Sequence, residues 1–328
     1  LTSNENYNGG TPLDDDTDKD GKPDYLDNDD DNDGILSANE GNDPNKNGLP
    51  EDAVDEDHDG IVDYLDATVN AITLQMRAML QGAFSSSTLL MRDDLRAKNL
   101  IPSKQPYTVA PYSYTGTEVA ATSQFSIIGN NAPVDWVLIE LRSNADGKTI
   151  LQRKAALLQR DGDIVEADTG STTLRIPGAV PGNYYVAIRH RNHLGVMTAS
   201  PLSLMATPTL VDFSNPTTKT YGDANTRVPS KGISLLWAGD ANMDSRLISN
   251  GVGQDAGVIY AKILSAPLNS SFSSNFVVSG YNATDFTLDG DTIFTGPNND
   301  TNLLIANVLV YPANINFNAN YIVKGQLP

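Results

Sequence analysis

Regularly spaced acidic side chains between residues 14 and 66 carry the clearest chemistry in this sequence. Oxygen-bearing side chains recur at positions 1, 3 and 5 of four successive loops, a glycine stands at position 6, and acids return near positions 9 and 12. Calcium takes six to eight oxygen ligands, and the glycine permits the sharp turn that aims alternate side chains at one centre. The predicted calcium ligands of this region are Asp16, Asp18, Asp20, Asp24, Asp27, Asp29, Asp31, Asp33, Glu40, Asp43, Asn45, Asn47, Glu51, Asp55, Asp57, Asp59, Asp63 and Asp66.

The negative charge of the chain is concentrated in the same region. Residues 14–66 hold 18 Asp and three Glu against three Lys, a net charge of −18 out of −19 for all 328 residues. Two carboxylates about 4 Å apart repel each other by about 4 kcal/mol at an effective dielectric constant near 20, and the few apolar residues here cannot drive folding by burial. We therefore expect calcium, with more than one ion per loop unit, to act as the core. A solvated acidic spacer is the alternative.

The acidic loops resemble the thrombospondin type 3 repeat. Its pattern D-x-D-x-D-G-x-x-D is present in residues 16–27 and 55–66 almost without departure. The third unit departs from it, with Asn45 and Asn47 in place of acids and Pro44 inside the loop, so its site is expected to be the weakest. The chain lacks the cysteines of the animal proteins, as does the bacterial version of this repeat, which occurs in surface and secreted proteins.

The last part of the chain is an internal duplication at a constant offset of 45 residues. Twelve residues between Asp240 and Gly280 match twelve between Asp285 and Gly325 without a gap. Each copy begins with alternating oxygen side chains and runs through a loop to an acid that precedes an apolar stretch. The predicted calcium ligands are Asp240, Asn242, Asp244 and Asp255 in the first copy and Asp285, Asp289, Asp291 and Asp300 in the second.

The apolar stretches 258–264 and 303–309 are predicted to be short helices. Asp255 and Asp300 are placed at their N-caps, and Pro267 and Pro312 follow their ends. Asx turns that cap helices without calcium are the alternative, because Ser245 stands where the first loop would have its glycine. The duplication resembles a dockerin-type domain, which implies calcium at each loop. The closing residues 320–328 are similar to the dockerin-like end domain of large secreted bacterial proteins, so Pro328 is expected to be the natural C-terminus.

The middle of the chain predicts a β-sandwich of the immunoglobulin-like or jelly-roll type. Apolar and polar residues alternate with period two, and Gly, Pro, Asn and Asp clusters separate the segments. The predicted strands are 71–84, 118–128, 134–142, 149–158, 172–176, 183–191 and 196–204, and residues 91–98 are predicted to form a helical turn. The expected fold class is mainly β: a polar tail (1–13), calcium-loop repeats (14–66), the sandwich (67–206), a linker (207–234) and a small α+β dockerin-like tandem repeat (235–328).

The segment Arg189-His190-Arg191-Asn192-His193 is the one catalytic-looking feature of the middle region. Strand alternation would put the two histidines on opposite faces, so they should not share a metal ion. We expect a structural role, with pairing to Asp161, Asp163 or Glu166; a carboxylate- or sugar-binding face and catalysis are the alternatives. The sequence contains no zinc-protease, phosphate-loop or serine-hydrolase motif. No catalytic residue and no cofactor other than calcium is therefore predicted, and the chain is not expected to be an enzyme.

Composition excludes further classes. The absence of cysteine removes disulfides, thiolate zinc sites and cysteine nucleophiles, and the negative charge disfavours nucleic-acid binding. The longest apolar runs are shorter than the roughly 18 residues of a membrane span.

The expected function follows from these segments together. Residues 89–96, 134–142, 156–162 and 185–195 are similar to a module near the C-termini of large secreted proteins of gliding bacteria. The resemblance implies a calcium-rigidified, non-enzymatic C-terminal region of a secreted, cell-surface adhesin or appendage-forming filament protein. Expected partners are a cell-surface or self-assembly protein, a glycan or further copies in a homo-oligomer. The alternatives are an anchoring module of a secreted hydrolase whose catalytic domain lies upstream of Leu1, and a sandwich enzyme.

Overall fold

The fold is mainly β, as predicted. A computed structural model describes residues 11, 13–33, 36–48, 50–55, 60–67, 72–176, 179, 181–205 and 207–328. The structure contains 26% strand and 13% helix. Contacts group the chain into two compact units: the first is Leu1–Thr73 with Arg175–Gly182 and Leu204–Thr207, and the second is Leu74–Leu174, Asn183–Ser203 and Pro208–Pro328. Among the described residues, no helix combines the length and apolar character needed to cross a membrane.

The acidic region of the first unit consists of loops that each lead into a single turn of 3-10 helix. These turns are η1 (Asp24–Leu26), η2 (Ser37–Asn39), η3 (Pro50–Asp52) and η4 (Asp63–Leu65). At three of them, the backbone N–H at position 9 donates to the carbonyl before position 1, as from Asp24 to Asp15 at 2.9 Å and from Asp63 to Val54 at 2.8 Å. The repeat in the sequence is therefore a repeat in the backbone.

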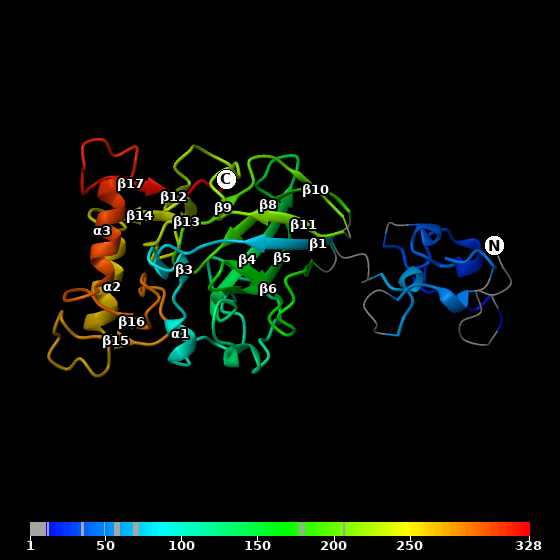
Figure 1. Cartoon of the computed structure of the whole chain (residues 1–328), viewed down its shortest axis with the longest axis horizontal. Coiled ribbons are helices and arrows are strands. Elements are labelled where there is room, and N and C mark those ends of the chain that lie inside the picture. Colours follow the sequence, from blue (N-terminus) through cyan, green and yellow to red (C-terminus); the bar gives the residue numbers. More distant parts are fainter. Residues whose placement is uncertain are drawn as a thin grey trace. The chain divides into compact units, whose positions relative to one another are not determined.

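The described strands of the middle region form one nine-stranded sheet, in the order β10-β8-β4-β5-β6-β1-β11, with β7 beside β1 and β9 beside β8 (Figure 1). The pairs β4–β5, β4–β8 and β5–β6 are antiparallel, whereas β1 and β11 are parallel. The strands are β1 (Ile72–Arg77), β4 (Pro133–Ser143), β5 (Ile150–Gln159), β6 (Asp163–Val165), β7 (Leu174–Ile176), β8 (Gly182–Arg189), β9 (Val196–Met197), β10 (Leu202–Leu204) and β11 (Thr209–Asp212).

Strand β4 lies between β8 and β5 in the interior of this sheet, and both of its faces are buried. The Trp136 indole N–H donates to the Pro102 carbonyl at 2.8 Å, and the Tyr107 hydroxyl donates to the Trp136 carbonyl at 2.8 Å. The segment containing Pro102 and Tyr107 therefore covers the edge and face of β4 without pairing as a strand. Asp135, the neighbour of Trp136, is also fully buried.

Several boundaries differ from the sequence-based expectations. Residues 118–128 are not a strand: they hold an isolated bridge at Val119 and the 3-10 helix η5 (Gln124–Ser126), because this segment packs over the sheet through side chains such as Glu118. Residues 207–234 are not a linker, since they contain β11 and β12 (Arg227–Ser230), which pairs with β13 (Ile233–Leu236). The described strands β1 and β4–β11 belong to one hydrogen-bonded sheet rather than the two sheets of the expected sandwich.

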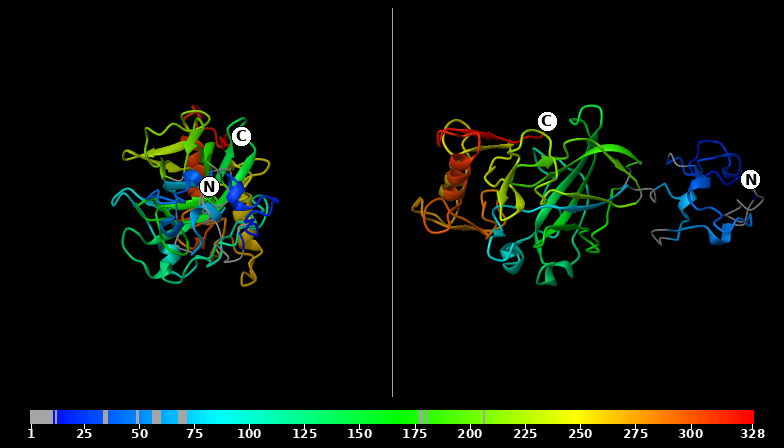
Figure 2. Two further views of the ribbon diagram at one scale, coloured as in Figure 1. Left: turned by 90° about the vertical axis from the view of Figure 1, so that its right-hand side faces the viewer. Right: turned by 45° about the horizontal axis from the view of Figure 1, so that its top comes forward.

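The predicted helices of the duplication are present. Helix α2 (Asp255–Leu264) ends before Pro267 and helix α3 (Asp300–Val310) ends before Pro312. Their apolar faces share one buried core with Trp237 and Phe286, to which Ile259, Ile263, Leu304 and Val308 contribute. Helix α3 can be followed in orange to red in the right-hand view of Figure 2. The predicted helical turn in the middle region is α1 (Asp94–Ala97).

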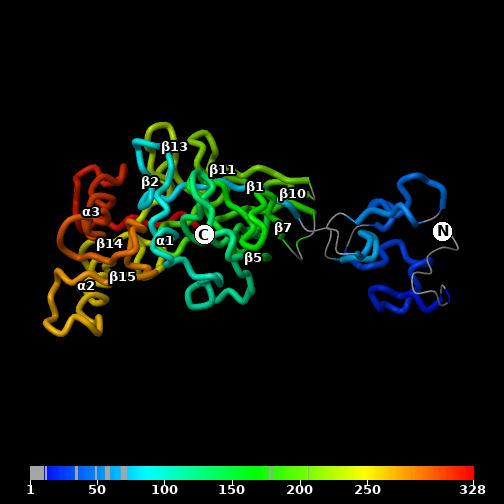
Figure 3. Tube along the Cα trace, turned by 60° about the horizontal axis from the view of Figure 1, so that its bottom comes forward, coloured from blue at the N-terminus to red at the C-terminus, as the bar shows by residue number. Residues whose placement is uncertain are grey.

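The two copies exchange strands. Strand β14 (Arg246–Ile248) of the first copy pairs with β17 (Ile322–Lys324) of the second, whereas β15 (Val278–Ser279) of the first pairs with β16 (Asp291–Thr292) of the second. Each copy thus completes the other's two-stranded ladder. The two copies form the yellow to red part of the tube in Figure 3. Neither copy can fold in this form alone.

The duplication is also joined tightly to the sheet. A Cβ atom at Gly82, just after β1, would lie 1.7 Å from the Phe286 carbonyl oxygen in the second loop, so only glycine fits there. The side-chain amides of Gln81 and Asn307 exchange two hydrogen bonds of 2.8 Å. The remaining short strands, β2 (Phe84–Ser85) and β3 (Leu90–Met91), form a hairpin in the same region. Residues 235–328 therefore share one compact unit with the sheet.

Candidate calcium-binding loops

The acidic region buries carboxylates and exposes apolar side chains. Asp24, Asp31 and Asp63 are only 5%, 6% and 5% exposed, whereas Leu26 and Leu36 are 53% and 52% exposed. A buried carboxylate costs several kcal/mol unless it is paired or coordinates a metal ion. This distribution is the reverse of a hydrophobic core and fits a core made of cations.

Two groups of carboxylates converge closely enough to hold an ion. Asp16, Asp18 and Asp20 have oxygens within 4.8 Å of one another, as do Asp29, Asp31 and Asp33. Burial and the nearby charge of Asp33 raise the pKa of Asp31 to about 7. Buried, hydrogen-bond-unsatisfied oxygens remain on Asp15, Asp16 and Asp31. Hard oxygen donors in this number suit calcium.

The acidic loops and the C-terminal loops share one backbone scaffold. In five loops the carboxylate at position 1 accepts the N–H of position 6: Asp16 from Gly21 at 3.1 Å, Asp43 from Gly48 at 2.8 Å, Asp55 from Gly60 at 3.2 Å, Asp240 from Ser245 at 2.9 Å and Asp285 from Gly290 at 2.8 Å. Position 4 has a left-handed backbone at Lys19, Asn32, Lys46, Met243 and Leu288. Ser245 takes the left-handed conformation (φ 64°) of the missing glycine. Serine in place of glycine at position 6 therefore leaves the backbone conformation of this loop unchanged.

The closing acids bind the start of their own loops. The Asp24 carboxylate accepts the position 2 N–H of Thr17 at 2.8 Å. Asp255 accepts the equivalent N–H of Ala241 at 2.8 Å, and Asp300 accepts that of Phe286 at 2.7 Å. The prediction that Asp255 and Asp300 are N-caps was wrong. Each is the first residue of its helix and is turned back to the loop, while Gln254 and Asn299 occupy the N-cap positions.

Burial perturbs the acids of the two C-terminal loops. Burial and the neighbouring Asp255 raise the pKa of Asp240 to about 8, and burial raises that of Asp255 to about 7. In the second loop burial raises the pKa of Asp285 to about 6, and burial together with Asp285 raises that of Asp300 to about 8. A cation bound between the two buried acids of each loop would stabilise their charged forms.

The other predicted ligands of the C-terminal loops differ in their hydrogen-bond partners. Asn242 and Asp289 use a side-chain oxygen to accept an N–H two residues ahead, from Asp244 at 3.1 Å and Asp291 at 2.9 Å. Asp291 was predicted as a ligand, but its carboxylate accepts hydrogen bonds from Lys98 at 2.7 Å and from Ser279. Asp291 therefore ties the second loop to the end of α1 and to β15, and its part in calcium binding stays a prediction. Asp244 and Asp289 remain at position 5.

The third acidic loop uses part of its polar groups for hydrogen bonds within the loop. The Asn47 amide donates to Glu51 at 2.9 Å, and Asp52, at position 10, accepts the N–H of Asn45 at 2.9 Å. Of the fourth loop, Asp63 and Asp66 are buried, whereas Asp57 and Asp59 lie outside the described residues. Asp27 of the first loop pairs with Lys22 at 3.1 Å, and Glu40 of the second is buried.

Sequence reasoning missed several oxygen donors of the acidic region. Asp15 and Asp30 are buried beside position 1 of the first two loops. Ser37 stands at position 9 of the second loop, where its hydroxyl oxygen accepts the Asp30 N–H at 3.0 Å, as Asp24 does for Thr17 in the first. Aligning the loops on position 1 would have found Ser37, because the equivalent residues of the other loops are acids.

The cluster after β8 has a structural role, but with different partners from those expected. The strand ends at Arg189, and the His190 and His193 rings then lie 4.8 Å apart, so the prediction of opposite faces was wrong. Asp135 accepts from Arg191 at 3.0 Å, lies 3.1 Å from His190 Nε2 and accepts from the Tyr281 hydroxyl. The partners are therefore not Asp161, Asp163 or Glu166. His190 to His193 are all buried, so they form no exposed sugar-binding face.

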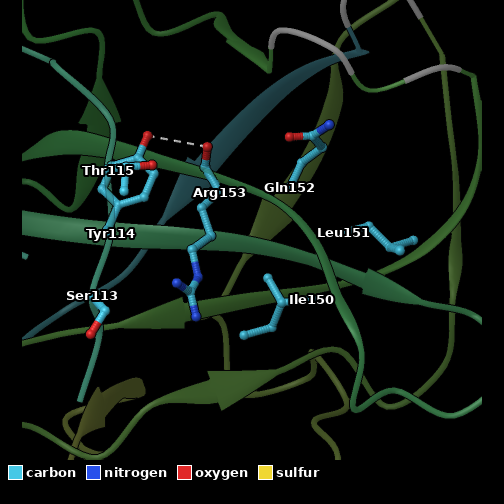
Figure 4. A pocket seen from close by; sticks show the side chains of 7 residues that line it. All are labelled: Ser113, Tyr114, Thr115, Ile150, Leu151, Gln152 and Arg153. Carbon is cyan, nitrogen blue, oxygen red and sulfur yellow. Dashed lines mark hydrogen bonds between the residues drawn. The ribbon is translucent and has the colours of Figure 1, made fainter. Parts of the chain in front are cut away.

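A shallow hollow on the second unit is lined by polar residues (Figure 4). The Tyr114 hydroxyl donates to the Arg153 carbonyl at 3.3 Å and to Glu118. The lining comprises Ser113, Tyr114, Thr115, Ile150, Leu151, Gln152 and Arg153. It contains one aromatic ring and no pair of carboxylates, which is not the arrangement of a glycoside hydrolase.

Comparison with known proteins adds no relative. No protein-family model, curated protein or solved structure matches the chain.

Replacing one predicted ligand in the first acidic loop and one in the third should show which of the two loops binds calcium more tightly. Asp20→Ala removes a charged oxygen from a three-carboxylate group, whereas Asn47→Ala removes a neutral side chain that already binds Glu51. We expect Asp20→Ala to weaken one class of calcium sites about tenfold, or about 1.4 kcal/mol, and Asn47→Ala to change affinity less. Calorimetric titration of the full chain measures both. Asp14→Ala is the matched control, since Asp14 lies outside the loop and binds Thr11; equal losses for Asp20 and Asn47 would contradict the ranking.

Without calcium, the second unit should lose stability as pH rises from 6.5 to 9. The raised pKa values of Asp240, Asp255 and Asp300 mean that the folded chain holds protons that the unfolded chain releases, so stability falls as pH passes through about 7 to 8. The lowered pKa values of the buried His190 and His193 act below this window. We expect the melting temperature to fall by about 4 °C or more, and saturating calcium to remove the slope. A melting temperature that rises with pH in calcium-free buffer would contradict this.

Proposed function

We propose that this chain is a calcium-stabilised, non-enzymatic part of a secreted bacterial surface protein. In this proposal the acidic loops are thrombospondin type 3-like units that make a stiff connector, and the second unit, with its dockerin-like duplication, presents a binding surface to a cell-surface protein or a glycan. The observation that carries the proposal is the burial of Asp24, Asp31 and Asp63 beside exposed Leu26 and Leu36. In this proposal a cation core offsets the cost of burying these carboxylates in a compact form.

Extracellular localisation is part of the same proposal. Extracellular calcium modules commonly bind with dissociation constants of about 10⁻⁴–10⁻³ M, which suits loops whose ligands are partly neutral. The chain has no cysteine, so metal coordination would take the place that disulfides have in many small secreted domains.

The sheet edges favour an adhesive connector over a filament assembled by strand addition. The outer strands β10 and β11 have only three and four residues. Pro201 directly precedes β10, and Pro208 directly precedes β11. Short edges next to proline resist pairing with another chain. Self-assembly, if it occurs, would use another surface.

Stretching single molecules of the full chain tests the connector function. In calcium, residues 14–66 should resist extension until a discrete unfolding step that releases about 180 Å, the extended length of 53 residues at about 3.4 Å each. With chelator that step should be absent and the segment should extend smoothly from low force. Superimposable curves with and without calcium would reject the proposed function.

A further inference from the structure

Asn192 lies between the two C-terminal loops and contacts the first residue of each. It follows β8, and no part of it is exposed. Its backbone carbonyl accepts the N–H of Gly239 at 3.0 Å and of Asp240 at 3.1 Å. Its side-chain amide nitrogen donates to the Asp285 carbonyl at 2.6 Å. Asp240 and Asp285 are position 1 of the two loops, so one buried residue of the segment after β8 is bonded to the equivalent residue of each loop.

The orientation of the Asn192 amide is fixed by the histidine pair. The backbone N–H of Gly82 donates to His193 Nε2 at 3.1 Å, so Nε2 is an acceptor and the ring proton of neutral His193 is on Nδ1. That Nδ1–H lies 2.8 Å from Asn192 Oδ1. The same Nδ1 lies 3.1 Å from His190 Nδ1, but the Asp285 carbonyl can only accept, so the amide nitrogen must point to Asp285 and Oδ1 to His193. The side chain cannot rotate without losing both bonds.

Each position 1 residue also organises the ion-binding part of its loop. The Asp240 carboxylate accepts the N–H groups of Asp244 and Ser245 at 3.0 and 2.9 Å. Asp285 does the same for Asp289 and Gly290 at 3.2 and 2.8 Å. A shift of the position 1 backbone therefore moves position 5 as well. A loop closed around an ion in turn fixes Asn192 in the position in which it bonds to the other loop.

We propose that Asn192 is a positioning residue that couples calcium binding at the two C-terminal loops. The inference rests on the proposed calcium binding of these loops. Filling one loop fixes Asn192, so the second loop binds with less loss of conformational freedom and therefore more tightly. The exchanged ladders β14–β17 and β15–β16 offer a competing route between the copies, and the experiment separates the two routes.

Hydrogen exchange of the full chain, read by mass spectrometry during a calcium titration, follows each loop through its own peptides. Asp289→Ala disables the second loop, and the calcium midpoint of residues 240–255 should then rise about fivefold or more. Asp244→Ala should raise the midpoint of residues 285–300 by the same factor, since coupling is reciprocal. In chains that also carry Asn192→Ala, both changes should fall below about twofold.

Two further variants make the outcome specific. Asn192→Asp keeps an oxygen for His193 and replaces the donor to Asp285 by a carboxylate oxygen that cannot bond to that carbonyl, so it should reduce the coupling even if Asn192→Ala folds poorly. Asn269→Ala is the matched control: Asn269 is a buried amide of the first copy that binds Ile263 and Ser273 and neither loop, so coupling should persist. If calcium protects neither loop of the native chain, the proposed function fails. If calcium protects both loops and coupling survives in the Asn192 variants, or is absent from the native chain, the inference fails and the calcium sites remain.

Discussion

In calcium-free buffer, residues 14–66 are expected to expand and become sensitive to proteases, while the strands of the sheet stay resistant. The segment carries a net charge of −18, and seven of its described acids are buried: Asp15, Asp24, Asp30, Asp31, Glu40, Asp63 and Asp66. Without a cation core their repulsion is not offset by apolar burial, because Leu26 and Leu36 are exposed even in the compact form. A segment of 53 residues has a radius of gyration of about 10 Å when compact and about 22 Å when unfolded.

Small-angle scattering of the full chain with calcium and with chelator measures this change, and mapped cleavage sites locate it. Sodium chloride at matched ionic strength is the control, since screening weakens repulsion without supplying a coordinated ion. We expect salt alone to leave the segment expanded. Superimposable scattering profiles would contradict a calcium core.

Asp135→Ala should destabilise the second unit by about 3–5 kcal/mol, the cost of leaving a buried charge without its partner. Asp135 is fully buried and accepts hydrogen bonds from Arg191 and Tyr281. Burial alone would raise its pKa, but the charge of Arg191 and the hydrogen bond from His190 hold the pKa of Asp135 below its usual value. The substitution leaves the Arg191 guanidinium buried over the Tyr281 ring, 4.2 Å from its centre.

Urea unfolding followed by tryptophan fluorescence measures this loss, because both tryptophans, Trp136 and Trp237, are buried in the second unit. Asp163→Ala is the matched control. Asp163 pairs with Arg77 at 2.7 Å, but both side chains are about one-third exposed, so the control should cost less than about 1 kcal/mol. Similar losses for the two variants would show that the Asp135 cluster does not hold the sheet to the C-terminal copies.

Local periodicity predicted the parts of the fold that depend on nearby residues. Strands β4 and β5 and helices α2 and α3 follow from alternation, apolar runs and the prolines that end them. The same alternation failed at residues 118–128, where Glu118 accepts the Ala155 N–H and the segment covers a strand instead of joining one. Apolar spacing records burial, and it does not distinguish a strand from a covering loop.

The sequence predicted those parts of the candidate site that depend on regular spacing along the chain. The oxygen-bearing side chains at positions 1, 3 and 5 and the turn glycines are local features, so the sequence located the loops, while their calcium binding stays a prediction. The pairing of Asp291 with Lys98, of Asp135 with Arg191 and of Asn192 with Asp285 joins residues 193, 56 and 93 positions apart. No local pattern marks such partners. The adjacent histidines were missed because the strand was assumed to continue past Arg189.

Native mass spectrometry of the full chain counts the calcium ions that the folded loops bind. With one ion for each of four acidic loops and two C-terminal loops, and more than one expected per acidic unit, we predict more than six calcium ions. The triple variant Asp16→Asn, Asp18→Asn and Asp20→Asn, which removes one convergent carboxylate group, should lose at least one ion. A native chain that retains no calcium, or a triple variant that retains the native count, would contradict the account.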